Sequence, residues 1–460
     1  MRASPPRRPV LKAVSVALLG LAASAFAYYG LHRQRAFPPF SDAVEFVALA
    51  NDSTLASAAS GVRVLRRISS TDYLLSGWLE PFLRIWPRSA DPESARQVKM
   101  LQILSGRFLG LTLRVLDPRS TPPWDQMLIR GRAPIGGKAE IAAGAGIEMG
   151  AIEIGGTSYE VVGQFRPEIA ALRRSVVTYD SPSLASALAG ATPPPFRSVL
   201  IEGSPRWIVD PPRPSAAVRI VHSKPMGSLE FLLYVAGVGA LYWGGCLLTW
   251  RLIEGLALKN MPAVLRDGLL FLAAHRKRFF TFNGLYFGTA TFLYLVAYLL
   301  PDLQGLGWSL GQELVRGGRG TLGWAGEAYA TGSFAYAATT TLLINLFVGT
   351  IRDITLPSAV LPGVGAVIGL LRAALWGIVL SPTTELIAHK FKVVSFLEGE
   401  GYVIAMVFAA QVFVALRGPR GTRLRSYAGA LILNVKGLSI VAIVLALSAA
   451  VEAVVVLVFM

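Results

Sequence analysis

Long apolar runs recur along this chain and are separated by short polar or basic segments. Most of them reach the roughly 20 residues that a helix needs to cross the hydrocarbon core of a bilayer. Only 16% of the residues are charged, whereas a soluble protein carries nearer a quarter. The runs fall near residues 13–29, 229–250, 279–300, 334–351, 357–380, 401–416 and 437–459. The sequence therefore predicts a polytopic α-helical membrane protein with about seven spans.

The net charge of +16 comes from cations that flank the apolar runs rather than forming one patch. This pattern favours orientation in a membrane over binding of nucleic acid, which we do not expect as a partner. Basic residues concentrate at the N-terminus and in the segments 251–278 and 417–436. Because positively charged loops stay in the cytoplasm, these three segments are predicted to be cytoplasmic, in a bacterial inner (plasma) membrane.

The first apolar run, within residues 1–30, is predicted to be a signal-anchor. A cleavable signal peptide is the alternative, because Ala25-Phe26-Ala27 has the small-x-small pattern of a cleavage site. The uncleaved form is favoured because the run reaches spanning length and Tyr28-Tyr29 suits the membrane interface. In either case the segment that follows is exported.

Residues 31–227 contain no spanning run and are predicted to form an extracytoplasmic α/β domain, followed by a membrane domain at 228–460. Residues 43–67 are expected to be helical. Alternation in 111–116 predicts a half-buried strand, and 151–154 with 159–162 predict a hairpin around Gly155-Gly156. Further strands are expected at 175–179, 198–201 and 217–221, and the Pro-rich pieces 193–195 and 211–214 are expected to break or edge the sheet.

Residues 129–165 resemble the periplasmic core domain of MacB-type ABC permeases. That family has a Gly-Arg-x-Pro segment before an acidic residue, a small helix, a glycine and a hairpin that ends in Val-Val-Gly. Residues 176–188 resemble the strand and helix that follow, so the resemblance covers about 129–190. The matching residues are Gly131, Arg132, Pro134, Glu140, Gly150, Val161, Val162 and Gly163. The resemblance implies an extracytoplasmic interaction module rather than an active site.

Residues 275–416 resemble the stage II sporulation protein M family. The shared features are a basic set before a span, a span that contains asparagine, a Gly-rich span, and a polar segment that ends in Glu before an Ala-rich helix. Here they are residues 276–278, 344–346, 363–377 and 397–402. The resemblance implies a membrane partner in envelope or transport complexes and no established enzymatic reaction.

Ionisable residues near membrane depth are the candidate functional residues, because charges in lipid are costly. We expect Arg352-Asp353 to make a tight turn, after which the span 357–380 places Arg372 in its outer half. Glu398 and Glu400 would then open the next span from the outer side. Arg372 is therefore predicted to face Glu398 or Glu400 across a polar cavity that opens outward. The alternatives are that Arg372 snorkels to the outer interface, or pairs with Glu385 or a lipid headgroup.

Two further patterns concern the membrane domain. Glu385 and His389 are four residues apart and would share one helix face, which suits a proton relay, a metal ligand pair or an interfacial pair. Small residues at helix-packing spacing occur at Ala236, Ala240 and Gly244, and at Gly365 and Gly369 in a GxxxG pattern.

The sequence contains no Walker A motif, no GxSxG, no HExxH and no CxxC, and its one cysteine is Cys246. We therefore predict no enzyme, no cofactor and no metal site, and a separate ATPase subunit if ATP drives the protein. The leading hypothesis is a permease-like or accessory component of a transport-type (ABC-like) envelope complex, with other membrane subunits or a homo-oligomer as partners besides the bilayer. The alternatives are a non-transport scaffold for cell-envelope remodelling and, less favoured because no catalytic set is visible, a membrane enzyme.

Overall fold

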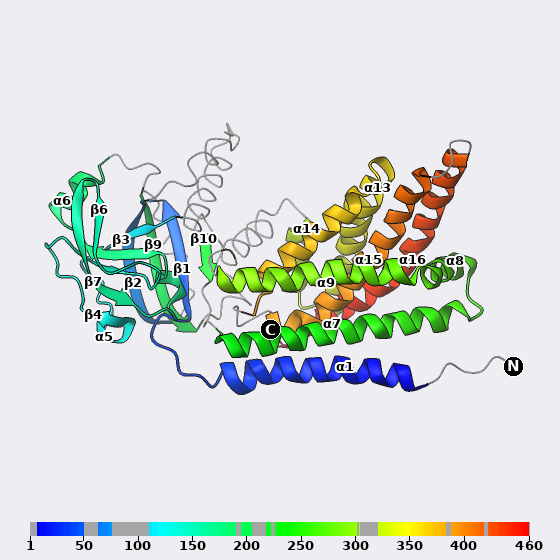
Figure 1. The fold of residues 1–460 in the computed structure, drawn as a ribbon, viewed down its shortest axis with the longest axis horizontal. Coiled ribbons are helices and arrows are strands. Elements are labelled where there is room, and N and C mark those ends of the chain that lie inside the picture. The colour runs from blue at the N-terminus through cyan, green and yellow to red at the C-terminus, as the bar shows by residue number, and fades with distance from the viewer. Residues whose placement is uncertain are drawn as a thin grey trace.

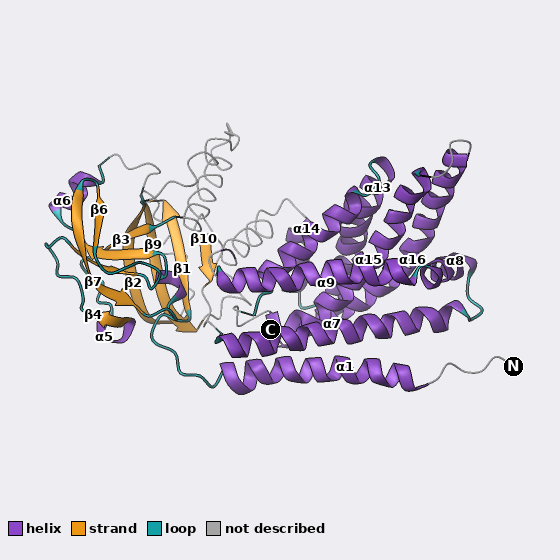
Figure 2. Cartoon of the chain, viewed as in Figure 1, coloured by secondary structure: helices purple, strands orange, loops and turns teal. Residues whose placement is uncertain are grey.

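The computed structural model describes residues 7–49, 63–75, 110–189, 195–204, 218–221, 226–300, 303, 321–382, 388–417 and 422–459. Within these residues the chain has two parts, a β-sheet domain and a helical bundle that lie end to end (Figure 1). The strands and the long helices are segregated between the two parts (Figure 2). The sheet domain is inserted between the first and the second long helix, as the sequence predicts.

Six helices of the described chain are long and apolar enough to cross a membrane. They are α1 (Arg7–Ala25) with its π-helical continuation η1 (Phe26–His32); α7 (Ser228–Ala257); α9 (Arg276–Leu299); the continuous α12 (Phe334–Leu343), η3 (Ile344–Thr355) and α13 (Leu356–Val360); α15 (Ala388–Leu416); and α16 (Arg423–Phe459). A shorter apolar helix, α14, spans Val364–Val379. The other helices of the bundle within the described residues are α8 (Ala263–Ala274) and α11 (Thr321–Ala330).

Two expected helix boundaries are wrong. Arg352-Asp353 does not turn, because η3 continues through both residues and α13 carries the helix on to Val360. Pro357 lies in the first turn of α13, and the chain reverses only around Gly363, whose φ of 98° suits a residue without a Cβ. Glu398 and Glu400 do not open a helix, because α15 begins at Ala388 and places both in its interior.

The predicted basic loops are also more helical than expected. α7 extends to Ala257 and α8 fills much of the segment 251–278, while α16 already begins at Arg423. These segments continue the apolar helices, because no proline stands between the apolar run of α7 and Pro262, or between Arg423 and the apolar run of α16.

Polar contacts divide the bundle into two ends. At the sheet-domain end, the Tyr298 hydroxyl donates to the Met226 carbonyl at 3.1 Å, so the end of α9 lies beside the start of α7. At the far end, Arg278 of α9 donates to Gln411 of α15 at 2.8 Å. The described parts of the segments 251–278 and 417–436 therefore share the end away from the sheet, where α1 also begins (Figure 1). The charge pattern predicts this common location.

The sheet domain holds a 10-stranded sheet in the order β10-β1-β9-β2-β3-β8-β5-β7-β4, with β6 paired to β7. β3 with β8 and β5 with β7 are parallel, and the other pairs are antiparallel. The strands are β1 (Ala43–Leu49), β2 (Arg63–Leu74), β3 (Thr112–Leu116), β4 (Leu128–Gly131), β5 (Glu140–Ala143), β6 (Ala151–Ile154), β7 (Thr157–Phe165), β8 (Ser175–Tyr179), β9 (Phe196–Ser204) and β10 (Val218–Val221). Short helical pieces are α5 (Trp124–Met127), η2 (Ala170–Leu172) and α6 (Pro182–Ala187).

The strands expected at 151–154, 159–162, 175–179, 198–201 and 217–221 are confirmed. The hairpin turn has positive φ at both Gly155 and Gly156, which are 57° and 78°. The helix expected at 43–67 is wrong, since this segment contributes β1 and the start of β2. β1 lies between β9 and β10 and is buried along both faces, so its sequence, which is apolar apart from Glu45, lacks the alternation of apolar and polar residues that marks a half-buried strand. Both Pro-rich pieces lie largely outside the described residues.

The helices α1 and α7 pack along each other through small residues (Figure 1). A Cβ at Gly237 would lie 2.6 Å from the Ser24 nitrogen and 2.8 Å from the Gly20 oxygen. A Cβ at Gly244 would lie 2.5 Å from the Ala17 nitrogen. Ala236 is exposed in the chain, and the residue that follows it makes the close approach instead. Backbone contact of this kind depends on the absence of side chains.

We expect Gly237→Val to separate α1 from α7, because the new side chain meets backbone atoms that cannot rotate away. The expected loss of stability is about 1–3 kcal/mol, typical of overpacking. Thermal unfolding of the full chain in detergent measures it. Ala236→Val is the matched control, since it adds a similar volume to an exposed position on the same helix and is expected to change stability by less than about 0.5 kcal/mol. Equal effects of the two variants would contradict the contact.

Candidate functional site

α15 is the most enclosed of the long helices, with 72% of its most apolar stretch buried. It lies among α7, α9, α14, η3 and α16. Three ionisable residues of this helix, Lys392, Glu398 and Glu400, are at least nine-tenths buried. Because successive residues of an α-helix are about 100° apart, Glu398 and Glu400 point to nearly opposite sides of α15. The helix therefore carries two separate polar sites.

Glu398 belongs to a site between α15 and η3. The Tyr402 hydroxyl lies 2.7 Å from Glu398 Oε1 and 3.1 Å from Asn345 Oδ1. A hydroxyl has one proton, so Tyr402 donates to only one of these two acceptors at a time. All three residues are buried, with Glu398 8% exposed and Tyr402 fully enclosed. The Tyr402 hydroxyl therefore links Glu398 of its own helix to Asn345 of η3 inside the bundle.

Arg372 of α14 lies over the face of the Tyr402 ring. Its guanidinium carbon is 4.5 Å from the ring centroid, a cation–π contact, and its Nη1 is 3.8 Å from Asp353 Oδ2. Among the described residues, the carboxylate within 4 Å of Arg372 is therefore Asp353, not Glu398 or Glu400. Glu398 is joined to Arg372 through Tyr402, and Gly349 gives the guanidinium room, since a Cβ there would lie 2.6 Å from Nη1.

The same polar region reaches α16. Glu452 lies beside the Tyr329 hydroxyl and is close enough to Glu398 to interact with it electrostatically. The Tyr329 hydroxyl is also 3.0 Å from Thr341 Oγ1. We refer to Asn345, Asp353, Arg372, Glu398, Tyr402 and Glu452 as the tyrosine-centred cluster. Glu452 was visible in the sequence as an acidic residue in the apolar run 437–459, a signal that the sequence reasoning did not use.

Glu400 faces α7 and α9 instead. It is 1% exposed, and three side chains of α7 and α9 approach its carboxylate, but none of them meets the geometry of a full hydrogen bond to either oxygen. The side chains of Cys246, Asn283 and Thr249 lie beside it. Cys246 Sγ donates to Asn283 Oδ1 at 2.9 Å, and Asn283 Nδ2 donates to the Phe279 carbonyl at 3.2 Å.

Lys392 connects α15 to the N-terminal helix. Its Nζ donates to Ser24 Oγ at 2.9 Å and lies 5.5 Å from the centroid of the Tyr234 ring. Lys392 precedes the apolar run at 401–416, so the hydropathy pattern does not predict that it lies inside the bundle. Its burial follows from the earlier start of α15.

The remaining sequence candidates contribute to packing or lie outside the described chain. Gly365 packs against Ile354 and Ser358, and Gly369 packs against the Met406 side chain of α15. Glu385 lies outside the described residues, and so does the side chain of His389. Within the part of the chain that the structure describes, no group of three or more His, Cys, Asp or Glu side chains could hold a metal ion.

In the sheet domain, the Gly-Arg-x-Pro segment makes a structural pair. Arg132 Nη1 and Nη2 donate to the two oxygens of Glu140 at 2.6 and 2.8 Å, and the Ile135 amide donates to the same carboxylate at 3.0 Å. The hydrogen bond from Arg132 is the main cause that lowers the pKa of Glu140 to about 2. The carboxylate therefore stays ionised at any physiological pH and serves to fix the loop that follows β4.

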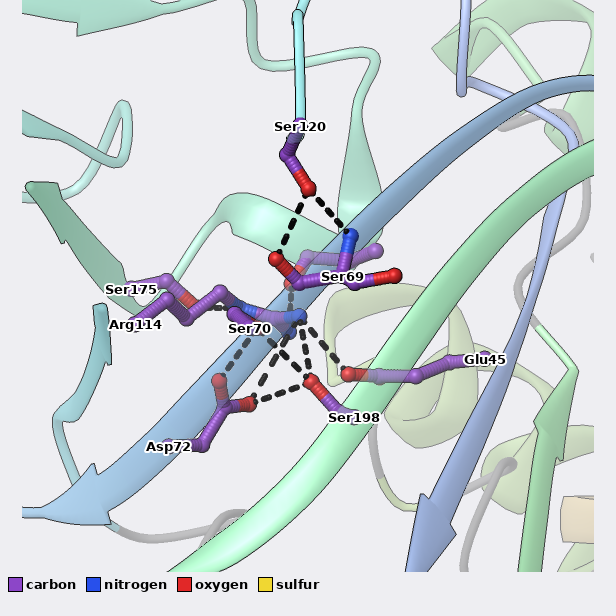
Figure 3. Close-up of polar contacts among 9 residues, drawn as sticks. Glu45, Ser69, Ser70, Asp72, Arg114, Ser120, Ser175 and Ser198 are labelled. Carbon is purple, nitrogen blue, oxygen red and sulfur yellow. Dashed lines mark hydrogen bonds and ion pairs between the residues drawn. The ribbon is translucent and has the colours of Figure 1, made fainter. Parts of the chain in front are cut away.

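The centre of the sheet holds a buried charge cluster (Figure 3). Arg114 Nη1 lies 2.8 Å from Glu45 Oε1 and 3.7 Å from Asp72 Oδ2, and its Nε donates to Ser175 Oγ at 3.1 Å. The hydroxyls of Ser70 and Ser198 donate to the Asp72 carboxylate at 2.6 and 2.7 Å. β3 is thus buried on both faces, whereas its alternation predicted a half-buried strand.

Comparison of the chain with protein-family models, with curated proteins and with solved structures finds no match. The tyrosine-centred cluster combines a hydroxyl that can donate to either of two acceptors, a cation and acidic side chains within a bundle of apolar helices. In such surroundings, ionisable residues commonly mark the path of an ion, a proton or a substrate.

Proposed function

We propose that this chain is an integral membrane component of a transport-type envelope complex, permease-like or accessory, that relies on a separate ATPase subunit. The observation that carries the proposal is the tyrosine-centred cluster inside the bundle, because burying such groups in a membrane protein is costly unless they serve a pathway or a switch. The resemblance of residues 129–190 to MacB-type permeases supports the same class.

The way that the two parts of the chain are joined supports coupling between them. α1 ends and α7 begins at the sheet domain, and Glu230 holds the two helix ends together. Its carboxylate accepts from the Gly227 amide at 2.8 Å and lies 3.4 Å from His32 Nδ1 and 3.6 Å from Arg35 Nη1. In the proposal the sheet domain is extracytoplasmic, the basic end of the bundle faces the cytoplasm of a bacterial cell, and a movement of α1 and α7 passes between them.

Purification of the full chain in a mild detergent tests the proposal. We expect a nucleotide-hydrolysing subunit to co-purify, and charge reversal at Arg266 and Arg276, at the basic end, to reduce its recovery severalfold. Arg130→Glu on the exposed face of β4 is the matched control and should leave recovery unchanged. If no such subunit is recovered even after cross-linking in membranes, the hypothesis of transport driven by a partner ATPase is wrong. The scaffold for envelope remodelling, which the stage II sporulation protein M resemblance favours, then stands in its place.

A further inference from the structure

Glu400 is a buried carboxyl group for which the described structure supplies no counter-charge. Both of its oxygens lack a hydrogen-bond partner among the described residues, and the residue is 1% exposed. Lys392, on the same helix, lies about 12 Å away along the axis at 1.5 Å per residue, and its amine is occupied by Ser24. An ionised carboxylate in this position without compensation is strongly disfavoured.

The groups that surround Glu400 are those that accept a small cation. Asn283 of α9 and Thr249 of α7 place an amide and a hydroxyl beside the carboxylate. Carboxylate, amide and hydroxyl oxygens are the ligands of hard cations. The titratable neighbour on α7 is Cys246, whose Sγ already donates to Asn283 Oδ1, and α16 brings Leu445 against the adjacent Gly401. A single negative charge among neutral oxygens balances one positive charge.

We propose that Glu400, with Asn283 and Thr249, forms a buried binding site for a monovalent cation, either a proton or Na⁺, that is released and rebound. A divalent ion does not suit it, because a single carboxylate would leave one positive charge uncompensated in a buried site. The site is separate from the tyrosine-centred cluster, because Glu400 and Glu398 point to nearly opposite sides of α15. It requires no ATPase and stands whether or not the proposed function does.

Reaction with a hydrophobic carbodiimide tests the site on the full-length chain in detergent. This reagent modifies protonated carboxyl groups in apolar surroundings, and mass spectrometry of peptides locates the adduct. We expect an adduct on Glu400 at pH 6 that declines as the pH rises. Once most of the carboxyl groups are ionised, each further pH unit lowers the protonated, reactive fraction about tenfold. Glu400→Gln should abolish the adduct, and Glu160→Gln on the exposed face of the sheet domain should not.

Sodium distinguishes the two cations. Protection by Na⁺ at constant pH, with no protection by choline, identifies a sodium site, whereas dependence on pH alone identifies a proton site. Thr249→Val and Asn283→Ala should leave the adduct at low pH. They should shift the pH at which labelling is half-maximal, or change the half-protecting Na⁺ concentration severalfold, which separates loss of a ligand from loss of folding. An adduct that is absent at every pH, or that changes with neither pH nor Na⁺, would overturn the proposal and leave Glu400 as a fixed structural group.

Discussion

Arg114→Met is expected to destabilise the sheet domain by about 3–5 kcal/mol, the usual cost of removing one partner from a buried ion pair. Glu45 and Asp72 are both fully buried and would lose the cation that lies between them. Methionine fills much the same volume as the arginine stem, so the loss reports charge rather than a cavity. Urea-dependent proteolysis of the full chain in detergent measures the stability of this domain separately from that of the bundle.

Two controls make this result specific. Arg132→Met removes an arginine that is half-exposed on the same domain and should cost far less. The triple variant Glu45→Gln, Asp72→Asn, Arg114→Met neutralises the whole cluster and should recover most of the loss, because no buried charge is then left uncompensated. If Arg114→Met changes stability by less than about 1 kcal/mol, the cluster does not hold the sheet together.

Local sequence patterns predicted the elements that short-range signals specify. The hairpin at Gly155-Gly156 and the strand at 175–179 follow from turn chemistry and β-branched residues that act within a few positions. β1 could not be recognised in this way, because it is flanked by β9 and β10, which lie about 150 or more residues later in the chain. Glu45 is also untypical of a buried strand, and its charge is balanced by Arg114 of the distant strand β3.

The candidate site was predictable in kind but not in geometry. A charge within an apolar run is visible in the sequence, and this signal pointed to Arg372, Glu398 and Glu400. The positions of these residues relative to one another depend on where the helices begin and end. Two boundaries differ from the predicted ones, because η3 continues through Asp353 and α15 begins already at Ala388. The first displacement brings Asp353 to Arg372, and the second turns Glu400 to the side of α15 away from it.

Arg372→Met is expected to destabilise the bundle by about 2–3 kcal/mol, because its guanidinium is the cation that faces Asp353 and stacks on Tyr402. The side chains of Arg372 and Asp353 are 23% and 25% exposed, so solvent moderates the effect below that of a fully enclosed pair. Tyr402→Phe keeps the ring under the guanidinium but removes the hydroxyl, and leaving buried Glu398 without this donor should cost about 1–3 kcal/mol.

A double-mutant cycle tests whether the losses of stability from Arg372→Met and Asp353→Asn add. If Arg372 and Asp353 interact directly, Arg372→Met with Asp353→Asn should cost less than the sum of the single variants by about 0.5–3 kcal/mol, since removing the second charge relieves the first deletion. Arg352→Met with Asp353→Asn is the matched cycle, because the Arg352 side chain is 63% exposed and its ion pair lies where water competes. Thermal and denaturant unfolding in detergent provide the free energies. Strict additivity in the Arg372 cycle would mean that the two charges are solvated separately, and the tyrosine-centred cluster would then end at Tyr402 rather than reach Asp353.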